Sequence, residues 1–108
     1  EYLNAFSNDG RKIFVFGDML ELGDASEKQH AEVGMKCSSL EIDIVYTIGK
    51  QTVFTNSSIN DKIFHKHFKS RELLIQTLKK TIKKNDKILF KGSRSMQMDK
   101  IIEKVFNI

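Results

Sequence analysis

The sequence of 108 residues contains no proline, no tryptophan and one cysteine, Cys37. A single cysteine excludes an internal disulfide, and no Cys/His group has the spacing of a zinc site. His65 and His67 share one strand face but have no third ligand, so we expect no metal site. No apolar run reaches the roughly 18 residues of a membrane span, and no secretory signal segment is present. These absences predict a cytoplasmic chain with no membrane partner.

The positive charge is modest, with a formal net charge of +4. The phenylalanines lie inside apolar stretches and not between lysines, where stacking platforms for nucleic acid would lie. We therefore expect no nucleic-acid partner. The lysine cluster is typical of the solvated face and last turn of a helix. Its members are Lys79, Lys80, Lys83, Lys84 and Lys87.

Apolar runs and helical stripes alternate along the chain, whose length suits one domain. The runs lack polar alternation, as in strands that are covered on both faces. We therefore predict a single α/β domain with a mainly parallel sheet and right-handed crossovers. Strands are predicted near 12–16, 42–48, 62–68 and 87–90, and helices after a capping box at Ser26, near 51–56, after Ser70 and from Met98.

Two loops at predicted strand ends carry candidate chemistry, because ligands of open α/β sheets gather beyond the carboxyl ends of the strands. The first loop, Gly17–Gly23, is bounded by glycines and holds the carboxylates of Asp18 and Glu21. The alternative is an acidic loop that only favours the next helix N-terminus. His30 follows on the apolar stripe of that helix, close to the acidic loop, where it is either a satisfied, semi-buried structural histidine or a catalytic residue.

The second loop is Lys91-Gly92-Ser93-Arg94-Ser95. A Gly/Ser turn from a strand into a helix offers free backbone N–H groups, and its lysine and arginine add two cations. We predict an anion site here; the alternative is a plain helix cap with solvated cations. No Gly-x4-Gly-Lys-Ser/Thr or Gly-x-Gly-x-x-Gly pattern occurs, so any machinery that grips nucleotide phosphates lies elsewhere.

These motifs together resemble the C-terminal domain of the Mur ligase family. Gly10-Arg11-Lys12, Gly-Asp-Met-Leu-Glu-Leu-Gly from Gly17, His30, Ile48-Gly49-Lys50-Gln51 and Lys-Gly-Ser-Arg-Ser-Met from Lys91 follow in the family's order. The likeness covers nearly the whole chain, and the pair of loop motifs is specific. It is most similar to the branch that joins D-alanyl-D-alanine to a UDP-N-acetylmuramoyl tripeptide, and it implies a Rossmann-like, three-layer fold.

The resemblance also implies a mechanism shared by three domains. ATP and Mg²⁺, bound mainly by a central P-loop domain of the same polypeptide, convert the tripeptide carboxylate to an acyl phosphate. The amine of D-alanyl-D-alanine then attacks it, and the C-terminal domain closes over the site. The family's Asp-x-Tyr-Asn-Ala-Asn-Pro segment is missing, and Tyr2, Leu3 and Phe6 suggest the tail of a helix. We therefore expect a domain that lacks its N-terminal edge and has no ligase activity alone.

The resemblance suggests roles for the two loops, although no residue here is identified as catalytic. Arg94, with the turn of Gly92, Ser93 and Ser95, would bind the carboxylate of the dipeptide, with electrostatic support from Lys91. Asp18 and Glu21 would orient the incoming ammonium or a water and Mg²⁺ shell, and His30 would brace their loop.

Two alternatives remain open. The chain could belong to another Mur-type ligase with a different amino acid or peptide substrate. It could instead be a non-catalytic α/β module that binds an anionic partner or nucleic acid.

Overall fold

The computed structural model describes residues 10–20 and 22–108. The predicted helix tail at 1–7 and Glu21 lie outside these residues. No helix of the described part is long and apolar enough to cross a membrane. The elements are β1 (Lys12–Gly17), a 3-10 turn η2 (Gly23–Ala25), α1 (Ser26–Ser39), β2 (Ile44–Ile48), α2 (Thr52–Ser57), β3 (Phe64–Phe68), α3 (Arg71–Thr81), β4 (Lys87–Lys91), a 3-10 turn η3 (Arg94–Met96) and α4 (Met98–Phe106).

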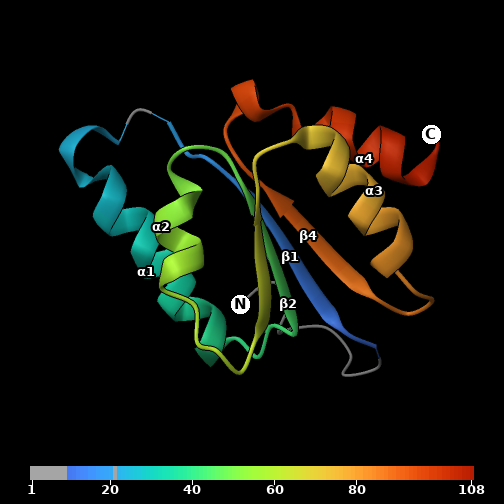
Figure 1. Ribbon diagram of the computed structural model, residues 1–108, viewed down its shortest axis with the longest axis horizontal. Helices are drawn as coiled ribbons and strands as arrows, with labels where there is room; N and C mark the ends of the chain where they lie inside the picture. Colours follow the sequence, from blue (N-terminus) through green and yellow to red (C-terminus); the bar gives the residue numbers. More distant parts are fainter. Residues whose placement is uncertain (1–9, 21) are drawn as a thin grey trace.

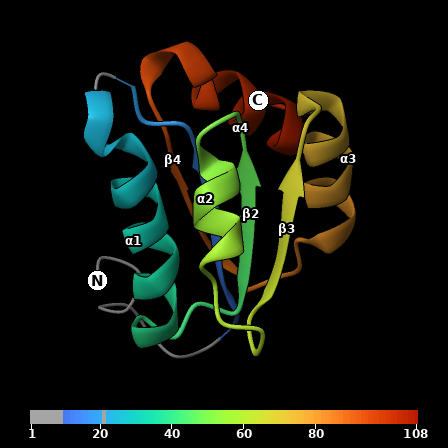
Figure 2. The same cartoon turned by 60° about the vertical axis from the view of Figure 1, so that its left-hand side comes forward.

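The four strands form one parallel sheet in the order β3-β2-β1-β4. Successive connections move outward from β1 to β2 to β3, and the next one returns across the sheet to place β4 on the other side of β1. Figure 2 shows β3 near one edge, beside β2. The direction of winding therefore reverses between β1 and β4, and ligands of open α/β sheets commonly bind near such a point.

Helices cover both faces of this sheet, with α1 and α2 on one side and α3 and α4 on the other (Figure 1). Because side chains alternate along β1, Phe14 and Phe16 pack towards α1, whereas Ile13 and Val15 pack towards α3 and α4. All six residues of β1 are buried. The predicted three-layer α/β fold with a parallel sheet is confirmed.

Two local predictions were wrong. Ser26 does not cap α1: the N-cap is Ala25, without a side-chain hydrogen bond, and the Ser26 hydroxyl instead donates to Gln51 Oε1 at 3.1 Å. The lysine cluster is not the end of one helix, because α3 ends at Thr81 and Ile82 turns to an extended conformation. Only Lys79 and Lys80 lie in the last turn of α3. The cap at Ser70 is confirmed, because its hydroxyl accepts from Leu73 N at 3.3 Å.

Candidate functional site

The two predicted loops meet at the carboxyl edge of the sheet, at the ends of β1 and β4. Ser93 N donates to the backbone oxygen of Asp18 at 2.9 Å. Glycine favours this approach, because a Cβ atom on Gly92 would lie 3.2 Å from Gly17 Cα, closer than ordinary van der Waals contact. Gly92 thus allows the backbone after β4 to lie close to the end of β1.

Asp18 is buried and points away from the loop it belongs to. Its Oδ2 accepts from Lys50 N at 2.8 Å, and its Oδ1 accepts from Gln51 N at 2.8 Å and Thr52 N at 2.9 Å. These donors are the free N–H groups at the start of α2, whose own N-cap, Gln51, makes no side-chain cap. Asp18 therefore caps a helix that begins more than thirty residues later in the chain.

Gly49 makes room for this carboxylate. Its φ angle is +120°, and a Cβ atom there would lie 2.3 Å from Asp18 Oδ1. A side chain would therefore displace the carboxylate as well as strain the backbone. The sequence signal that could have revealed this contact is the repeated glycine at strand ends, at Gly17, Gly49 and Gly92.

His30 fixes the residue after Asp18. Its Nδ1 lies 2.7 Å from the backbone oxygen of Ser26 and its Nε2 lies 3.1 Å from Met19 N. Because a carbonyl only accepts and an amide N–H only donates, the ring carries its proton on Nδ1 and accepts with Nε2. The ring is 1% exposed, so both of its nitrogens are used inside the protein.

The second loop differs from its predicted geometry. Gly92 and Ser93 do not lead directly into the last helix, because η3 and Gln97, with φ +53°, come between them and α4. The dipole of α4 therefore does not point from Ser93 into the loop. Ser93 Oγ and Ser95 Oγ lie 3.0 Å apart.

Arg94 is the free cation of this turn. Its side chain is exposed and makes no hydrogen bond or ion pair with any residue in 10–20 or 22–108. The turn that presents it is held at both ends, by the contact between Ser93 and Asp18 and by Gln97 N donating to Arg94 O at 3.0 Å. A guanidinium in this position can donate two parallel hydrogen bonds to a carboxylate or phosphate.

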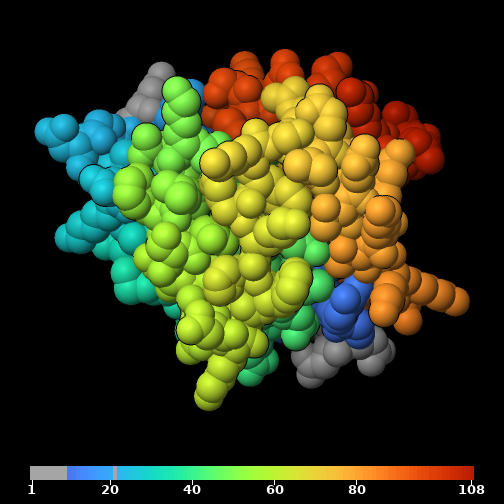
Figure 3. Space-filling model, in the orientation of Figure 1, coloured from blue at the N-terminus to red at the C-terminus, as the bar shows by residue number. Residues whose placement is uncertain are grey.

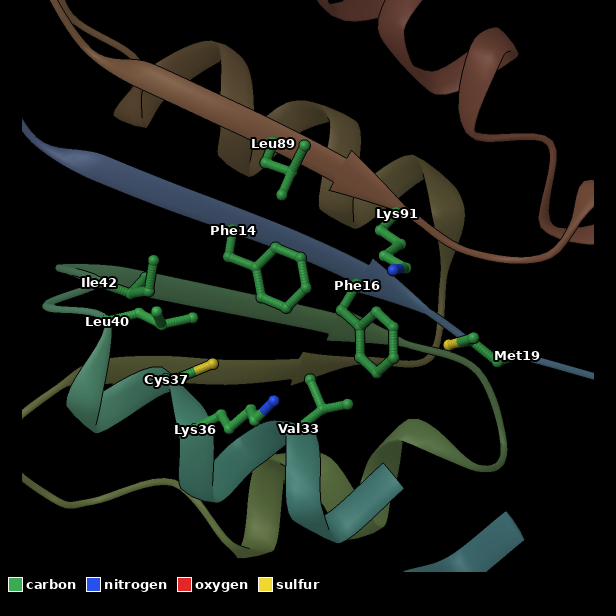
Figure 4. A pocket seen from close by; sticks show the side chains of 10 residues that line it. All are labelled: Phe14, Phe16, Met19, Val33, Lys36, Cys37, Leu40, Ile42, Leu89 and Lys91. Carbon is green, nitrogen blue, oxygen red and sulfur yellow. The ribbon is translucent and has the colours of Figure 1, made fainter. Parts of the chain in front are cut away.

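Lys91 extends from the end of β4 over an apolar pocket between α1 and the sheet (Figure 4). Phe14, Phe16 and Leu89 form the wall on the sheet side, and Cys37 lies on the helix side. Burial raises the pKa of the Cys37 thiol to about 11, so it is an unreactive packing residue at neutral pH. Lys91 also borders the loop residues Met19, Leu20, Gly92 and Ser93.

The described residues do not fit a Mg²⁺ site. No three side chains of His, Cys, Asp or Glu in 10–20 and 22–108 come together as metal ligands. Asp18, the candidate for a Mg²⁺ shell, already uses both oxygens on backbone N–H groups. Its buried carboxylate is satisfied by these donors and is not available as a metal ligand.

The family model described as "Mur ligase, glutamate ligase domain" matches residues 1–94. Curated relatives include the UDP-N-acetylmuramoyl-tripeptide–D-alanyl-D-alanine ligase of Bacillus subtilis, 41% identical over 98 residues, which are 87% of this chain and 21% of that protein. The enzyme of the same name from Escherichia coli is 37% identical over 97 residues, which are 86% of this chain and 20% of that protein. The chain thus spans about a fifth of the length of these relatives.

Solved structures give the same result. MurF from Acinetobacter baumannii superposes with a TM-score of 0.81 and 25% identity over 93% of this chain and 23% of that one. MurF from Thermotoga maritima, solved in complex with ADP, has a TM-score of 0.73 and 28% identity over 89% of this chain and 22% of that one. The chain therefore belongs to the Mur ligase family, as its C-terminal domain.

Proposed function

We propose that this chain is the dipeptide-receiving domain of an ATP-dependent ligase that joins D-alanyl-D-alanine to UDP-N-acetylmuramoyl tripeptide in peptidoglycan synthesis. The names of the relatives support this substrate pair. ATP and Mg²⁺ would be bound mainly by a central P-loop domain of the same polypeptide, since the described residues do not fit the metal. The reaction would take place in the cytoplasm.

The observation that carries the proposal is the free Arg94 at the point where the winding of the sheet reverses. Arg94 would bind the carboxylate of the dipeptide. The Ser93 and Ser95 hydroxyls lie 3.0 Å apart, so one donates to the other and the second would donate to the carboxylate. Lys91, the last residue of β4, lies beside Gly92 and Ser93, and its positive charge would favour binding of the carboxylate. Because the turn is already held by hydrogen bonds, little further ordering of the backbone accompanies binding.

Asp18 and His30 would act as positioning residues in this reaction. The Asp18 carboxylate is enclosed by N–H donors, so it would orient the substrate through the loops that it joins, not by direct contact with the ammonium. His30 would hold Met19 and thereby the loop between β1 and α1. The role expected for Glu21 lies outside the described residues and stays a prediction.

Replacing Arg94 by Ala in the full-length ligase tests the proposal. Loss of charge-assisted hydrogen bonds costs about 1.5–3 kcal/mol, which is roughly a 10- to 150-fold rise in KM for D-alanyl-D-alanine. Activation of the tripeptide carboxylate, measured by trapping the acyl phosphate with hydroxylamine, should persist because Arg94 does not take part in it.

Lys79→Ala is the matched control, because it also removes one exposed cation but lies at the far end of α3. It should leave KM unchanged. Arg94→Lys, which keeps the charge without the fork of donors, should recover part of the affinity. An unaltered KM in Arg94→Ala would reject the assignment of the dipeptide carboxylate to this turn.

A further inference from the structure

A second group of cations lies at the same edge of the sheet, at the ends of β2 and β3. Lys50 follows β2, Lys69 follows β3, and Arg71 is the first residue of α3. All three line one open groove, which no acidic side chain of the described residues enters. Figure 3 shows the segments meeting on one face, with green atoms after β2 beside yellow atoms at the start of α3, below the orange-red segment after β4.

The groove combines this cationic rim with an apolar floor. Ile48, Val53, Phe68 and Met96 supply apolar side chains between the charged ones. A solvated lysine patch needs no such floor. An apolar floor with charges at its edge matches a small molecule that has an apolar body and an anionic group.

Lys50, Lys69 and Arg71 form no ion pair within the described part of the protein, although the neighbouring Glu72 carboxylate interacts electrostatically with Arg71. The ion pair between Arg11 and Asp86 lies far from the groove. It joins the chain before β1 to the chain before β4, at the amino edge of the sheet. The nearest buried carboxylate is that of Asp18, whose oxygens are turned towards backbone N–H groups. The three cations outnumber the two neighbouring carboxylates, Glu72 beside Arg71 and the buried Asp18, so the net charge around the groove is positive and favours an anion.

Arg71 is fixed in place before any ligand arrives. Its Nη1 donates to Gln97 Oε1 at 2.8 Å and its Nη2 donates to Met96 O at 3.4 Å. These contacts connect the groove to the end of the turn that carries Arg94. A guanidinium that is already oriented loses less side-chain freedom when it binds an anion, so the groove is partly prepared for its ligand.

We propose that this groove is a second anion-binding subsite, which takes a carboxylate or phosphate attached to a small apolar body. The inference rests on the proposed function for the two sources of the anion, the nucleotide and D-alanyl-D-alanine. The dipeptide has one carboxylate, so its binding in this groove would replace the assignment of that carboxylate to Arg94. The groove differs from the Arg94 subsite in its residues, because Lys50, Lys69 and Arg71 come from the ends of β2 and β3. The two subsites share only the segment from Arg94 to Gln97.

Titration of the isotope-labelled 108-residue chain with D-alanyl-D-alanine and, separately, with ADP tests the inference. At least one probe should cause saturable shifts of the amide signals of Lys50, Lys69 and Arg71, and these should weaken as NaCl is raised. Shifts with the dipeptide alone identify a carboxylate ligand, and shifts with ADP alone identify a phosphate ligand. No saturable shift with either probe overturns the inference.

Lys50→Gln combined with Lys69→Gln should lower the affinity at least tenfold. Both side chains are exposed, and the Lys50 backbone contact with Asp18 stays available, so the fold should be preserved. Lys79→Gln with Lys80→Gln removes the same charge at the other end of α3 and should have no effect. Equal weakening in both double variants would show a general charge effect and overturn the subsite.

Arg94→Ala separates this inference from the proposed function. In one outcome, the amide signals of Lys50, Lys69 and Arg71 still shift in the Arg94→Ala chain, and the KM of the full-length Arg94→Ala ligase for D-alanyl-D-alanine is unchanged. This outcome would reject the proposed contact between Arg94 and the dipeptide but keep the groove as an anion subsite. In the other outcome, Arg94→Ala abolishes these amide shifts and raises the KM for D-alanyl-D-alanine. This outcome would reject the groove as a separate subsite but keep the proposed function.

Discussion

At Asp18, one carboxylate accepts three backbone N–H groups from the start of α2, while the backbone oxygen of the same residue accepts from Ser93. A single residue thus connects the ends of β1, β2 and β4. Acidic side chains in loops at strand ends are readily interpreted as ligands for ammonium groups or metals. The burial of Asp18 and its complete set of donors favour a positioning role instead.

Asp18→Asn tests this role by keeping the shape of the side chain. The amide NH₂ would face an N–H donor, and the charge that strengthens the remaining bonds would be lost. We expect the free energy of unfolding to fall by about 2–3 kcal/mol, measured by urea denaturation. Asp24→Asn, in the exposed turn η2, should change it by less than about 0.5 kcal/mol. Equal stabilities of the two variants would contradict the positioning role.

At the scale of elements, the contact between α1 and α2 depends on Gly34. A Cβ atom there would lie 2.2 Å from the backbone oxygen of Thr55, and Thr55 Oγ1 also donates to the His30 backbone oxygen at 2.7 Å. Glycine in the middle of a helix lowers helix stability by about 1 kcal/mol relative to alanine. Its presence in α1 is explained by this close approach of the two helices.

Gly34→Ala should therefore destabilise the domain although it improves helix propensity. Forcing the two backbones apart costs roughly 1–3 kcal/mol more than the propensity gained, and a lower thermal midpoint should show it. Ser38→Ala, on the exposed side of α1, gains propensity without a new contact and should leave the midpoint equal or slightly higher. A rise of the midpoint in Gly34→Ala would show that the helices separate easily.

Local patterns in the sequence were sufficient to predict most helices and strands, but not the contacts between residues that are far apart in the sequence. Each correct prediction depended on residues that are close together in the sequence. They are the apolar run of β1, the cap at Ser70 and the apolar stripe of α4, and the structure contains all three. The cap of α2 was missed because its acceptor, Asp18, lies more than thirty residues away. The groove at Lys50, Lys69 and Arg71 was missed for the same reason, since only the sheet order brings these residues together.

At the scale of the whole molecule, an ion pair between Arg11 and Asp86 joins the segments that precede β1 and β4, at the amino edge of the sheet. Arg11 Nε and Nη2 donate to Asp86 Oδ1 and Oδ2 at 3.1 and 2.7 Å, and Nη2 also donates to Thr81 O at 2.7 Å. The Asp86 side chain is 2% exposed. The hydrogen bonds from Arg11 hold the pKa of Asp86 below its ordinary value of 3.8, so this carboxylate is stabilised in its charged form.

This pair should make the stability of the domain sensitive to acid. Because the folded pKa of Asp86 is lowered, its contribution is fully present above the unfolded value of 3.8 and disappears as the pH falls through the folded value. The difference in unfolding free energy between the wild type and Asp86→Asn should be constant from pH 5 to about pH 7 and shrink below about pH 4. A difference that stays constant down to pH 2 would contradict this linkage.

The hydrogen bonds of Asp18 have a mechanical consequence for the carboxyl edge. The loops after β1, β2 and β4 share one buried carboxylate and one backbone contact, so none of them can swing without breaking bonds to the others. Arg94 and Lys50 therefore belong to one rigid set of hydrogen-bonded loops. If this edge approaches a partner domain, it should do so as a rigid body, with the bending confined to a hinge outside these loops.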